Sequence, residues 1–250
     1  MHAEDKSTYP PLNTLKAVAE DVWIIDGPSI RFGWGCIKFP FSTRATILRL
    51  AGDALLVHSP TPLVPTLAAA IGKIGTPRWI VGPNRLHYWW IGEWHAAYPD
   101  AAIYLAPKVQ RQAGARLDFA WQPLERDRGY PWDDRIATLP VSGGFMTEVE
   151  LFHRPSRTLV LTDLIENFET GKLETRAMRF WTRLGGVRDP DGGMPRDMRW
   201  SFVKHRRELK AAILRMIDWN PERIILAHGR WYDANGRAEL RRAFRWILDE

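Results

Sequence analysis

The segment Thr158-Leu-Val-Leu-Thr-Asp163 is a short apolar run that ends in a carboxylate. Two further segments repeat this form. Trp79-Ile-Val81 is followed by Gly82-Pro-Asn-Arg-Leu-His87, and Ile224-Ile-Leu-Ala-His228 ends directly in an imidazole. Short apolar runs flanked by turn residues are typical of strands buried on both faces. Because open sheets carry their chemistry at strand ends, the sequence predicts a site there.

Imidazole and carboxylate side chains together are suitable ligands for zinc, iron or manganese. His58 follows a fourth apolar strand, Ala54-Leu-Leu-Val57, and widens the set of candidates. A single histidine is more often a hydrogen-bonded structural residue than a metal ligand. The interpretation therefore depends on whether these strands are neighbours.

The chain has 250 residues, of which 45% are hydrophobic, and we expect a single domain over residues 1–250. No apolar run is long enough to cross a membrane, and the first residues lack the apolar segment of a secretory signal. Cys36 is the only cysteine, so no internal disulfide can form. These features favour a cytoplasmic protein.

Positive charge is concentrated in one segment, residues 172–210. It holds eleven Lys or Arg against five Asp or Glu, an excess equal to the net charge of +6 of the whole chain. This segment overlaps a basic, Trp-rich insert at about 170–207, which holds Phe180, Trp181, Trp200 and Phe202. Such composition suits an anionic ligand, a membrane surface or nucleic acid. The alternative is a solvated cap with its Trp side chains packed beneath.

Hydrophobic periodicity predicts alternating strands and helices. Strands are expected at 22–25, 44–50, 54–57, 79–81, 102–105, 135–139, 148–152, 158–162 and 224–227, and helices at about 63–74, 209–217 and 240–248. Polar and apolar residues alternate from Glu148 to Phe152, which predicts one wet face, and His153 is expected at the surface in a turn. The order favours an α/β fold, a four-layer αββα sandwich of two mixed sheets with outer helices, over a single doubly wound sheet.

From about Val22 onward the chain resembles the metallo-β-lactamase fold superfamily, and more narrowly an uncharacterised branch of it, a domain of unknown function. The resemblance rests on these segments: Arg44-Ala-Thr-Ile-Leu-Arg-Leu50, Leu55-Leu-Val-His-Ser-Pro60, Pro83-Asn-Arg-Leu-His87, Ile91-Gly-Glu-Trp94, Tyr98-Pro99, Phe152-His-Arg-Pro-Ser-Arg-Thr-Leu-Val-Leu-Thr-Asp163 and Ala227-His-Gly229. The resemblance implies the four-layer sandwich and a metal-dependent hydrolase.

Active members of the superfamily carry a His-x-His-x-Asp-His loop, a further histidine, a bridging aspartate and a final histidine. With Gly92 as the anchor, the ligand positions of that loop correspond to Arg85, His87, Trp89 and Trp90. The further histidine falls near Phe145, whereas Asp163 and His228 match the bridging aspartate and the final histidine. His58 stands where the family has a small acidic residue.

The lost ligands disfavour a two-metal centre, because Trp89 and Trp90 cannot bind a cation and Arg85 would repel one. His87, Asp163 and His228 could still hold one ion, zinc or else iron or manganese, with water completing its coordination. Such an ion lowers the pKa of bound water toward about 7. The alternative is a hydrogen-bonded relic without any metal.

Three functions follow from these observations. The first is a hydrolase with a mononuclear site, in which His58 or Asn84 orients water or a small-molecule substrate; the alternative for Asn84 is a cap of the turn that follows it. The second is a catalytically silent fold that binds a small ligand in the same crevice. The third is an interaction module whose residues 172–210 contact a membrane surface or an acidic partner. The Trp residues favour this interfacial role over sequence-specific recognition of nucleic acid.

Other residues are weaker candidates. Glu166 and Asn167 are expected to line the crevice, and His95 is expected to be structural, on a helix. Tyr88, Trp89, Trp90 and Trp94 form either an aromatic wall for a ligand or part of the core. His205 falls in the basic insert, His2 lies near the N-terminus, and Cys36 is read as a small buried residue.

Overall fold

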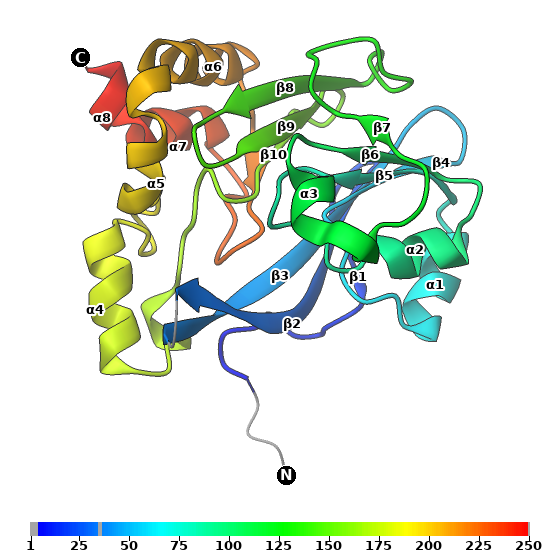
Figure 1. Cartoon of the computed structure of the whole chain (residues 1–250), viewed down its shortest axis with the longest axis horizontal. Coiled ribbons are helices and arrows are strands. Elements are labelled where there is room, and N and C mark those ends of the chain that lie inside the picture. The colour runs from blue at the N-terminus through cyan, green and yellow to red at the C-terminus, as the bar shows by residue number, and fades with distance from the viewer. Residues whose placement is uncertain (1–4, 35–36, 250) are drawn as a thin grey trace.

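Two β-sheets packed face to face form the centre of the molecule, and helices cover both outer sides (Figure 1). This computed structural model describes residues 5–34 and 37–249, so His2 and Cys36 lie outside the described residues. The four-layer αββα sandwich expected from the sequence is confirmed, and the single doubly wound sheet is wrong.

The first sheet has the order β1-β2-β3-β4-β5-β6-β7. Its first four strands pair antiparallel, and the others pair parallel. The strands are β1 (Leu15–Ala19), β2 (Val22–Trp34), β3 (Ile37–Arg49), β4 (Ala54–His58), β5 (Thr76–Gly82), β6 (Ala102–Leu105) and β7 (Gln122–Pro123). The antiparallel half is the long hairpin of β2 and β3, which extends beyond the strands predicted at 22–25 and 44–50.

The second sheet has the order β11-β10-β9-β8, and only β10 and β11 run parallel. Its strands are β8 (Ile136–Ser142), β9 (Thr147–His153), β10 (Thr158–Val160) and β11 (Arg223–Ile225). Because β10 and β11 are parallel neighbours, their carboxyl ends meet at one edge. Asp163 and His228 follow these two ends.

The helices complete the outer layers. They are α1 (Pro65–Gly72), α2 (Ile91–Ala97), α3 (Val109–Ala113), α4 (Arg176–Gly185), α5 (Arg196–Ser201), α6 (Arg206–Asp218), α7 (Gly236–Ala243) and α8 (Arg245–Leu248), with short 3-10 turns at Gly114–Arg116, Thr170–Lys172 and Val203–His205. The apolar stripe of α6 packs on the outer face of the second sheet, as its period predicts. No helix in the described ranges is both long and apolar enough to span a membrane.

The prediction of a wet face on β9 is wrong, because every residue of that strand is buried. Val149 and Leu151 belong to the core shared with the first sheet, and Phe152 stacks on Trp219 beneath the outer helices. Glu148 and Glu150 are buried on this second covered face. Burial, together with the neighbouring Glu148, raises the pKa of Glu150 well above its usual range.

His153 is also buried, not in a surface turn as expected. Its Nδ1 lies 2.7 Å from the Ser156 hydroxyl. Burial and the nearby Arg135 lower the pKa of His153 to about 4, so its ring is neutral at pH 7. A second layer covers the end of β9, which alternation along the strand could not reveal.

The basic insert forms α4 and α5, and its aromatic residues divide into two groups. Phe202 is buried, whereas Trp181 is 52% and Trp200 80% exposed. The expectation that the Trp side chains are packed beneath a cap is therefore wrong. The two helices lie at one side of the sandwich (Figure 1), and these Trp side chains remain open to solvent.

Arg44, one partner of a buried ion pair within the first sheet, also joins the two sheets near the site. Arg44 on β3 pairs with Asp26 on β2 at 2.7 Å, and both side chains are almost fully buried. The guanidinium also donates to the carbonyl oxygens of Leu226 and Gly229, at 2.5 and 3.0 Å. Arg44 therefore fixes the segment that follows β11 against the first sheet.

We predict that Arg44→Met lowers the free energy of unfolding by about 3 kcal/mol, because it leaves the Asp26 carboxylate buried with only Lys16 as a charged partner. The matched control is Arg128→Met, which removes a guanidinium that is 87% exposed and should cost less than about 1 kcal/mol. Urea unfolding followed by Trp fluorescence measures both. Equal losses of unfolding free energy in the two variants would contradict this role of Arg44.

Candidate metal centre

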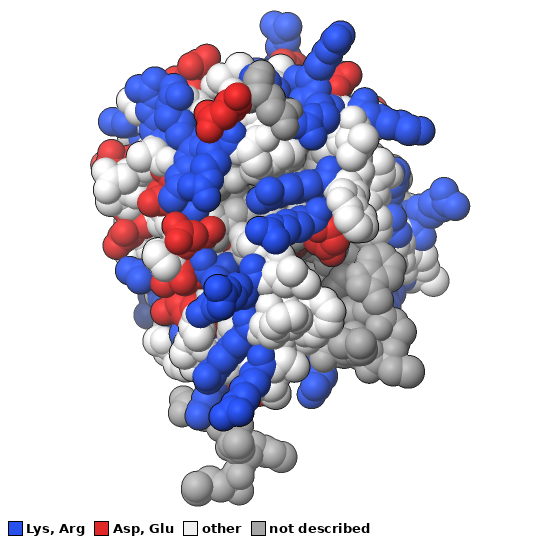
Figure 2. Space-filling model, turned by 90° about the vertical axis from the view of Figure 1, so that its left-hand side faces the viewer, with Lys and Arg blue, Asp and Glu red and all other residues white. Residues whose placement is uncertain are grey.

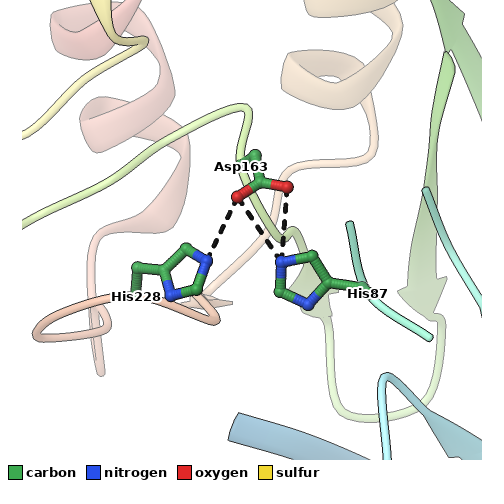
Figure 3. A group of neighbouring side chains, drawn as sticks. All are labelled: His87, Asp163 and His228. Carbon is green, nitrogen blue, oxygen red and sulfur yellow. Dashed lines mark hydrogen bonds and ion pairs between the residues drawn. The ribbon is translucent and has the colours of Figure 1, made fainter. Parts of the chain in front are cut away.

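Three side chains from three strand ends meet at one point (Figure 3). The Asp163 carboxylate lies 3.3 and 3.4 Å from His87 Nε2 through its two oxygens and 3.1 Å from His228 Nε2. One ligand atom from each residue lies within 4.8 Å of the others. His87, Asp163 and His228 are thus brought together by the fold. Their role as metal ligands stays a prediction.

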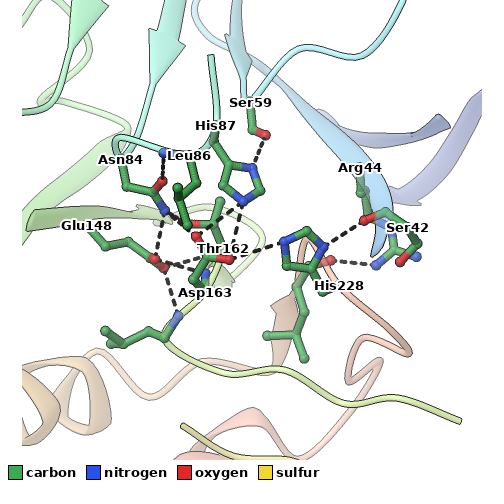
Figure 4. Close-up of polar contacts among 12 residues, drawn as sticks. Ser42, Arg44, Ser59, Asn84, Leu86, His87, Glu148, Thr162, Asp163 and His228 are labelled. Atoms are coloured by element: carbon green, nitrogen blue, oxygen red, sulfur yellow. Dashed lines mark hydrogen bonds and ion pairs between the residues drawn. The ribbon is translucent and has the colours of Figure 1, made fainter. Parts of the chain in front are cut away.

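Backbone contacts set the orientation of His228. Its Nδ1 donates to the carbonyl oxygen of Ser42 at 2.6 Å, so Nε2 faces Asp163 (Figure 4). The next residue, Gly229, has φ of +84°, and a Cβ there would stand 2.1 Å from the Asn167 carbonyl oxygen. Only glycine allows this close approach. A backbone-anchored Nδ1 is the usual support of a metal-binding histidine.

A side-chain contact holds His87, because the Ser59 hydroxyl lies 2.7 Å from its Nδ1. His58, the neighbour of Ser59, was expected to orient water or substrate. It is 2% exposed, and its Nε2 has no hydrogen-bond partner among the described residues. Burial and the nearby His87 lower the pKa of His58 to about 3, so its ring is neutral. His58 is absent from the cavity lining, which places it behind His87.

Asp163 is fixed by Glu148, which the sequence analysis did not identify as a site residue. The Glu148 carboxylate accepts hydrogen bonds from the backbone N–H groups of Thr162, Asp163 and Leu164, at 2.7, 2.8 and 3.2 Å. These bonds hold the turn that carries Asp163. The sequence shows Glu148 only as one of the polar residues that alternate with apolar ones along this strand, and alternation assigned it to solvent.

Asn84 completes the support (Figure 4). Its amide nitrogen donates to Asp163 at 2.6 Å and also contacts Glu148 and Thr162. Its side-chain oxygen accepts from the Leu86 N–H at 2.7 Å. Asn84 was expected to orient water or substrate, yet it is fully buried and its amide is engaged. Its geometry suits positioning of Asp163.

The charges within the triad support one another. Burial alone would raise the pKa of Asp163 and lower that of His228. Their contact reverses both effects, with His87 contributing on the Asp163 side, so the pKa of Asp163 is held below its usual range and that of His228 above. His228 Nδ1 donates to the Ser42 carbonyl oxygen and Nε2 contacts Asp163, so this geometry favours the charged imidazole beside the carboxylate. A metal ion would displace the proton from His228 Nε2.

The triad lines a cavity of about 1270 Å³. Glu166 also lines it, as expected, and burial raises the pKa of Glu166 to about 8, with His228 opposing and Asp163 reinforcing the shift. Asn167 does not line the cavity. Its amide bonds to Asp189 and to the carbonyl oxygen of Arg230, so the expectation for Asn167 is wrong.

The four aromatic residues near His87 serve different purposes. Tyr88 and Trp89 line the cavity. Trp94 is fully buried, with its Nε1 donating to the Thr61 carbonyl oxygen at 2.7 Å, and Trp90 packs at the core. His95 lies on α2, as expected, with its ring 4.2 Å from that of Phe119.

The donor set suits a single divalent ion. Two ligands at about 2.0 to 2.1 Å from a tetrahedral zinc lie roughly 3.3 Å apart, close to the observed contacts with Asp163. Within the described ranges, no second group of three or more such ligands occurs. Arg85 lies over the Phe145 ring at 4.7 Å, so the positions of two lost ligands are filled by a cation and an aromatic ring.

Solved structures share this architecture. A metallo-β-lactamase from Pontibacter korlensis is 11% identical, with 95% of this chain and 99% of that chain covered and a TM-score of 0.58. The metallo-β-lactamase FIM-1 from Pseudomonas aeruginosa, in its mono-zinc form, is 13% identical, with 94% and 96% covered and a TM-score of 0.56. The Flv1 flavodiiron core from Synechocystis sp. PCC6803 is 11% identical, with 95% and 61% covered and a TM-score of 0.61.

The protein therefore has the metallo-β-lactamase fold, with a His/Asp cluster where strands of its two sheets end. The sequence profile of a domain of unknown function, DUF4336, matches residues 21–179, and the chain belongs to that family. No curated protein matches the sequence significantly.

We predict that Glu166→Gln raises the free energy of unfolding of the chelator-treated protein more at pH 8 than at pH 5, in each case relative to the unsubstituted protein. The unfolded carboxyl group loses its proton near its usual pKa of 4.5, whereas the folded one keeps it until about pH 8. The folded state therefore binds the extra proton in this window, and stability falls as the pH rises. Glutamine removes this loss.

The measurement is urea unfolding of both proteins at half-unit steps from pH 4.5 to 9. The expected difference between the two proteins grows by about one to a few kcal/mol across the window. The exposed carboxylate Asp191, substituted as Asp191→Asn, is the control and should give a flat difference. If the difference in unfolding free energy for Glu166→Gln did not change with pH, the pKa of the folded Glu166 carboxyl group would not be raised, and the prediction would be wrong.

Proposed function

We propose that the protein is a metal-dependent hydrolase with one divalent ion held by His87, Asp163 and His228. One observation carries the proposal: two imidazole Nε2 atoms and a carboxylate converge in the lining of a large cavity, with both Nδ1 atoms already engaged. Two histidines and a carboxylate are a recurring catalytic zinc set. Zinc is therefore the favoured ion, with iron or manganese as alternatives.

A single ion is favoured over two. The positions of the remaining superfamily ligands hold Arg85, Trp89, Trp90 and Phe145, none of which coordinates a metal. The FIM-1 structure is described as a mono-zinc form, so one protein of this fold holds a single zinc. The same arrangement is the proposal for this chain.

The ion, when bound, would supply Lewis-acid activation of water and of the scissile group. The chain's own residues do the remaining work. Glu148 and Asn84 keep the Asp163 carboxylate oriented. Glu166 lines the cavity, and in the metal-free protein burial raises its pKa to about 8, so it is the candidate proton donor to a leaving group. The substrate is a small molecule that enters this cavity.

Metal analysis tests the centre. Protein purified without chelator should contain about one equivalent of metal per chain by inductively coupled plasma mass spectrometry. His228→Ala and Asp163→Asn should each lower the content about tenfold or more, because each removes one of three ligands. His205→Ala, in the basic insert, is the matched control and should retain the metal.

Two outcomes contradict the proposal. Two equivalents of metal would mean that ligands outside the triad take part. A folded wild-type protein that takes up none, even after dialysis against zinc, would leave the triad as a hydrogen-bonded relic. The second result favours the alternative, a catalytically silent fold that binds a small ligand in the cavity.

A second candidate function is docking on an anionic lipid surface through residues 172–210. The observation that favours it is the exposure of apolar side chains among Arg and Lys on α4, α5 and the turn after them: Phe180, Trp181, Leu184, Trp200 and Val203. Figure 2 views the molecule from this side and shows Lys and Arg side chains gathered over it, with uncharged surface between them. Basic helices with exposed Trp and Phe are typical of membrane interfaces.

Vesicle sedimentation tests this candidate. Binding to phosphatidylserine vesicles should weaken steeply between 50 and 500 mM salt. Trp200→Ala should weaken binding about tenfold, because it removes an interfacial aromatic anchor. Trp121→Ala is the control, since Trp121 is 42% exposed but lies outside the insert. Equal binding to uncharged vesicles would exclude an anionic surface.

A further inference from the structure

The cavity has an apolar wall that begins at the triad itself. Phe41 on β3 lies edge-on to the His228 ring at 5.2 Å and to Phe168 at 5.6 Å. From there the lining continues over Leu173 and Met178 to α4. A ligand whose reactive group is at the triad would therefore lie directly against hydrocarbon. Short polar substrates would leave this surface uncovered.

The far end of the cavity is also apolar, and it is open to solvent. Trp181, Leu184 and Trp200 line it and are 52%, 47% and 80% exposed. Exposed apolar surface rimmed by charge marks a binding site in soluble proteins. The volume of about 1270 Å³ exceeds the upper end of ordinary small-molecule pockets, about 1,000 Å³. This volume and the apolar lining together favour an extended hydrocarbon chain.

Guanidinium groups supply the polar part of the lining. Arg116 lies over the Trp89 ring at 5.0 Å, and Arg196 is the first residue of α5. In the described part of the chain, neither forms an ion pair with a carboxylate. Two guanidinium groups without such partners favour an anionic ligand group.

We infer that the cavity binds a single-chain anionic amphiphile, with its acyl chain along the aromatic wall and its carboxylate or phosphate at one of the lining arginines, Arg116 or Arg196. That such a molecule is the substrate rests on the hydrolase proposed above. Binding itself does not, because the wall and the arginines lie outside the triad.

Calorimetric titration with octanoate, decanoate, dodecanoate and tetradecanoate, each below its aggregation concentration, tests the inference. The protein is used as purified and again as chelator-treated His228→Ala, so that metal and turnover play no part. Affinity should rise about tenfold for each two methylene groups, because each added methylene is buried against the wall. Dodecyltrimethylammonium, which has a cationic head, should bind at least about tenfold more weakly than dodecanoate.

Matched variants separate the wall from general effects. Leu184→Asp places a charge in the lining and should weaken dodecanoate binding about tenfold or more. Leu214→Asp on α6 is the control, because Leu214 is 42% exposed and lies outside the cavity. Arg116→Gln combined with Arg196→Gln should weaken dodecanoate but not the cationic amphiphile. Arg128→Gln controls for loss of surface charge.

Affinity that is independent of chain length, or equal losses in the two leucine variants, would overturn the inference. Equal affinity for both head groups would overturn the part that concerns the arginines. Chain-length dependence in a protein that binds no metal would sustain this inference while the hydrolase proposal fails. A metal-loaded, active enzyme whose affinity for these amphiphiles does not depend on chain length would sustain the hydrolase proposal while this inference fails.

Discussion

The candidate centre depends on the carboxylate of Glu148 and the turn it holds. A buried carboxylate is costly unless hydrogen bonds compensate its charge, and the three N–H groups at the end of β10 provide these bonds. The same bonds fix the backbone that carries Asp163. Asn84, which follows β5 of the first sheet, contacts both Glu148 and Asp163. One network therefore ties the two sheets together at the site.

Because the ligands come from both sheets, the centre exists only when the sandwich is assembled. His87 belongs to the loop after β5, whereas Asp163 and His228 follow strands of the second sheet. The Ser42 carbonyl and the Arg44 guanidinium hold the His228 segment from β3. Metal affinity would thus report on packing of the sheets as well as on ligand chemistry. A substitution far from the triad that loosens this packing should lower metal affinity too.

Apolar runs and the residues after them pointed to His58, His87, Asp163 and His228, and the family resemblance reduced these to the triad that the fold brings together. The sequence could not show which residues hold the triad in position. Glu148 and Glu150 alternate with apolar residues, which looks like a solvated face, and alternation carries no information about a second covering layer. The length of the β2–β3 hairpin was missed because Pro28 and Pro40 interrupt its strand pattern. The exposure of Trp200 depends on where α5 packs, which periodicity does not specify.

The apolar wall connects the site's proton chemistry to its ligand preference. Burial among such residues is what keeps Glu166 protonated near neutral pH. The low polarity also strengthens the attraction between Asp163 and the imidazole rings, because little water screens it. A ligand chain that covers the wall would remove still more water and raise the pKa of Glu166 further. Recognition of an apolar chain and retention of the transferable proton therefore require the same surface, so a polar substitution such as Phe41→Ser should impair both together.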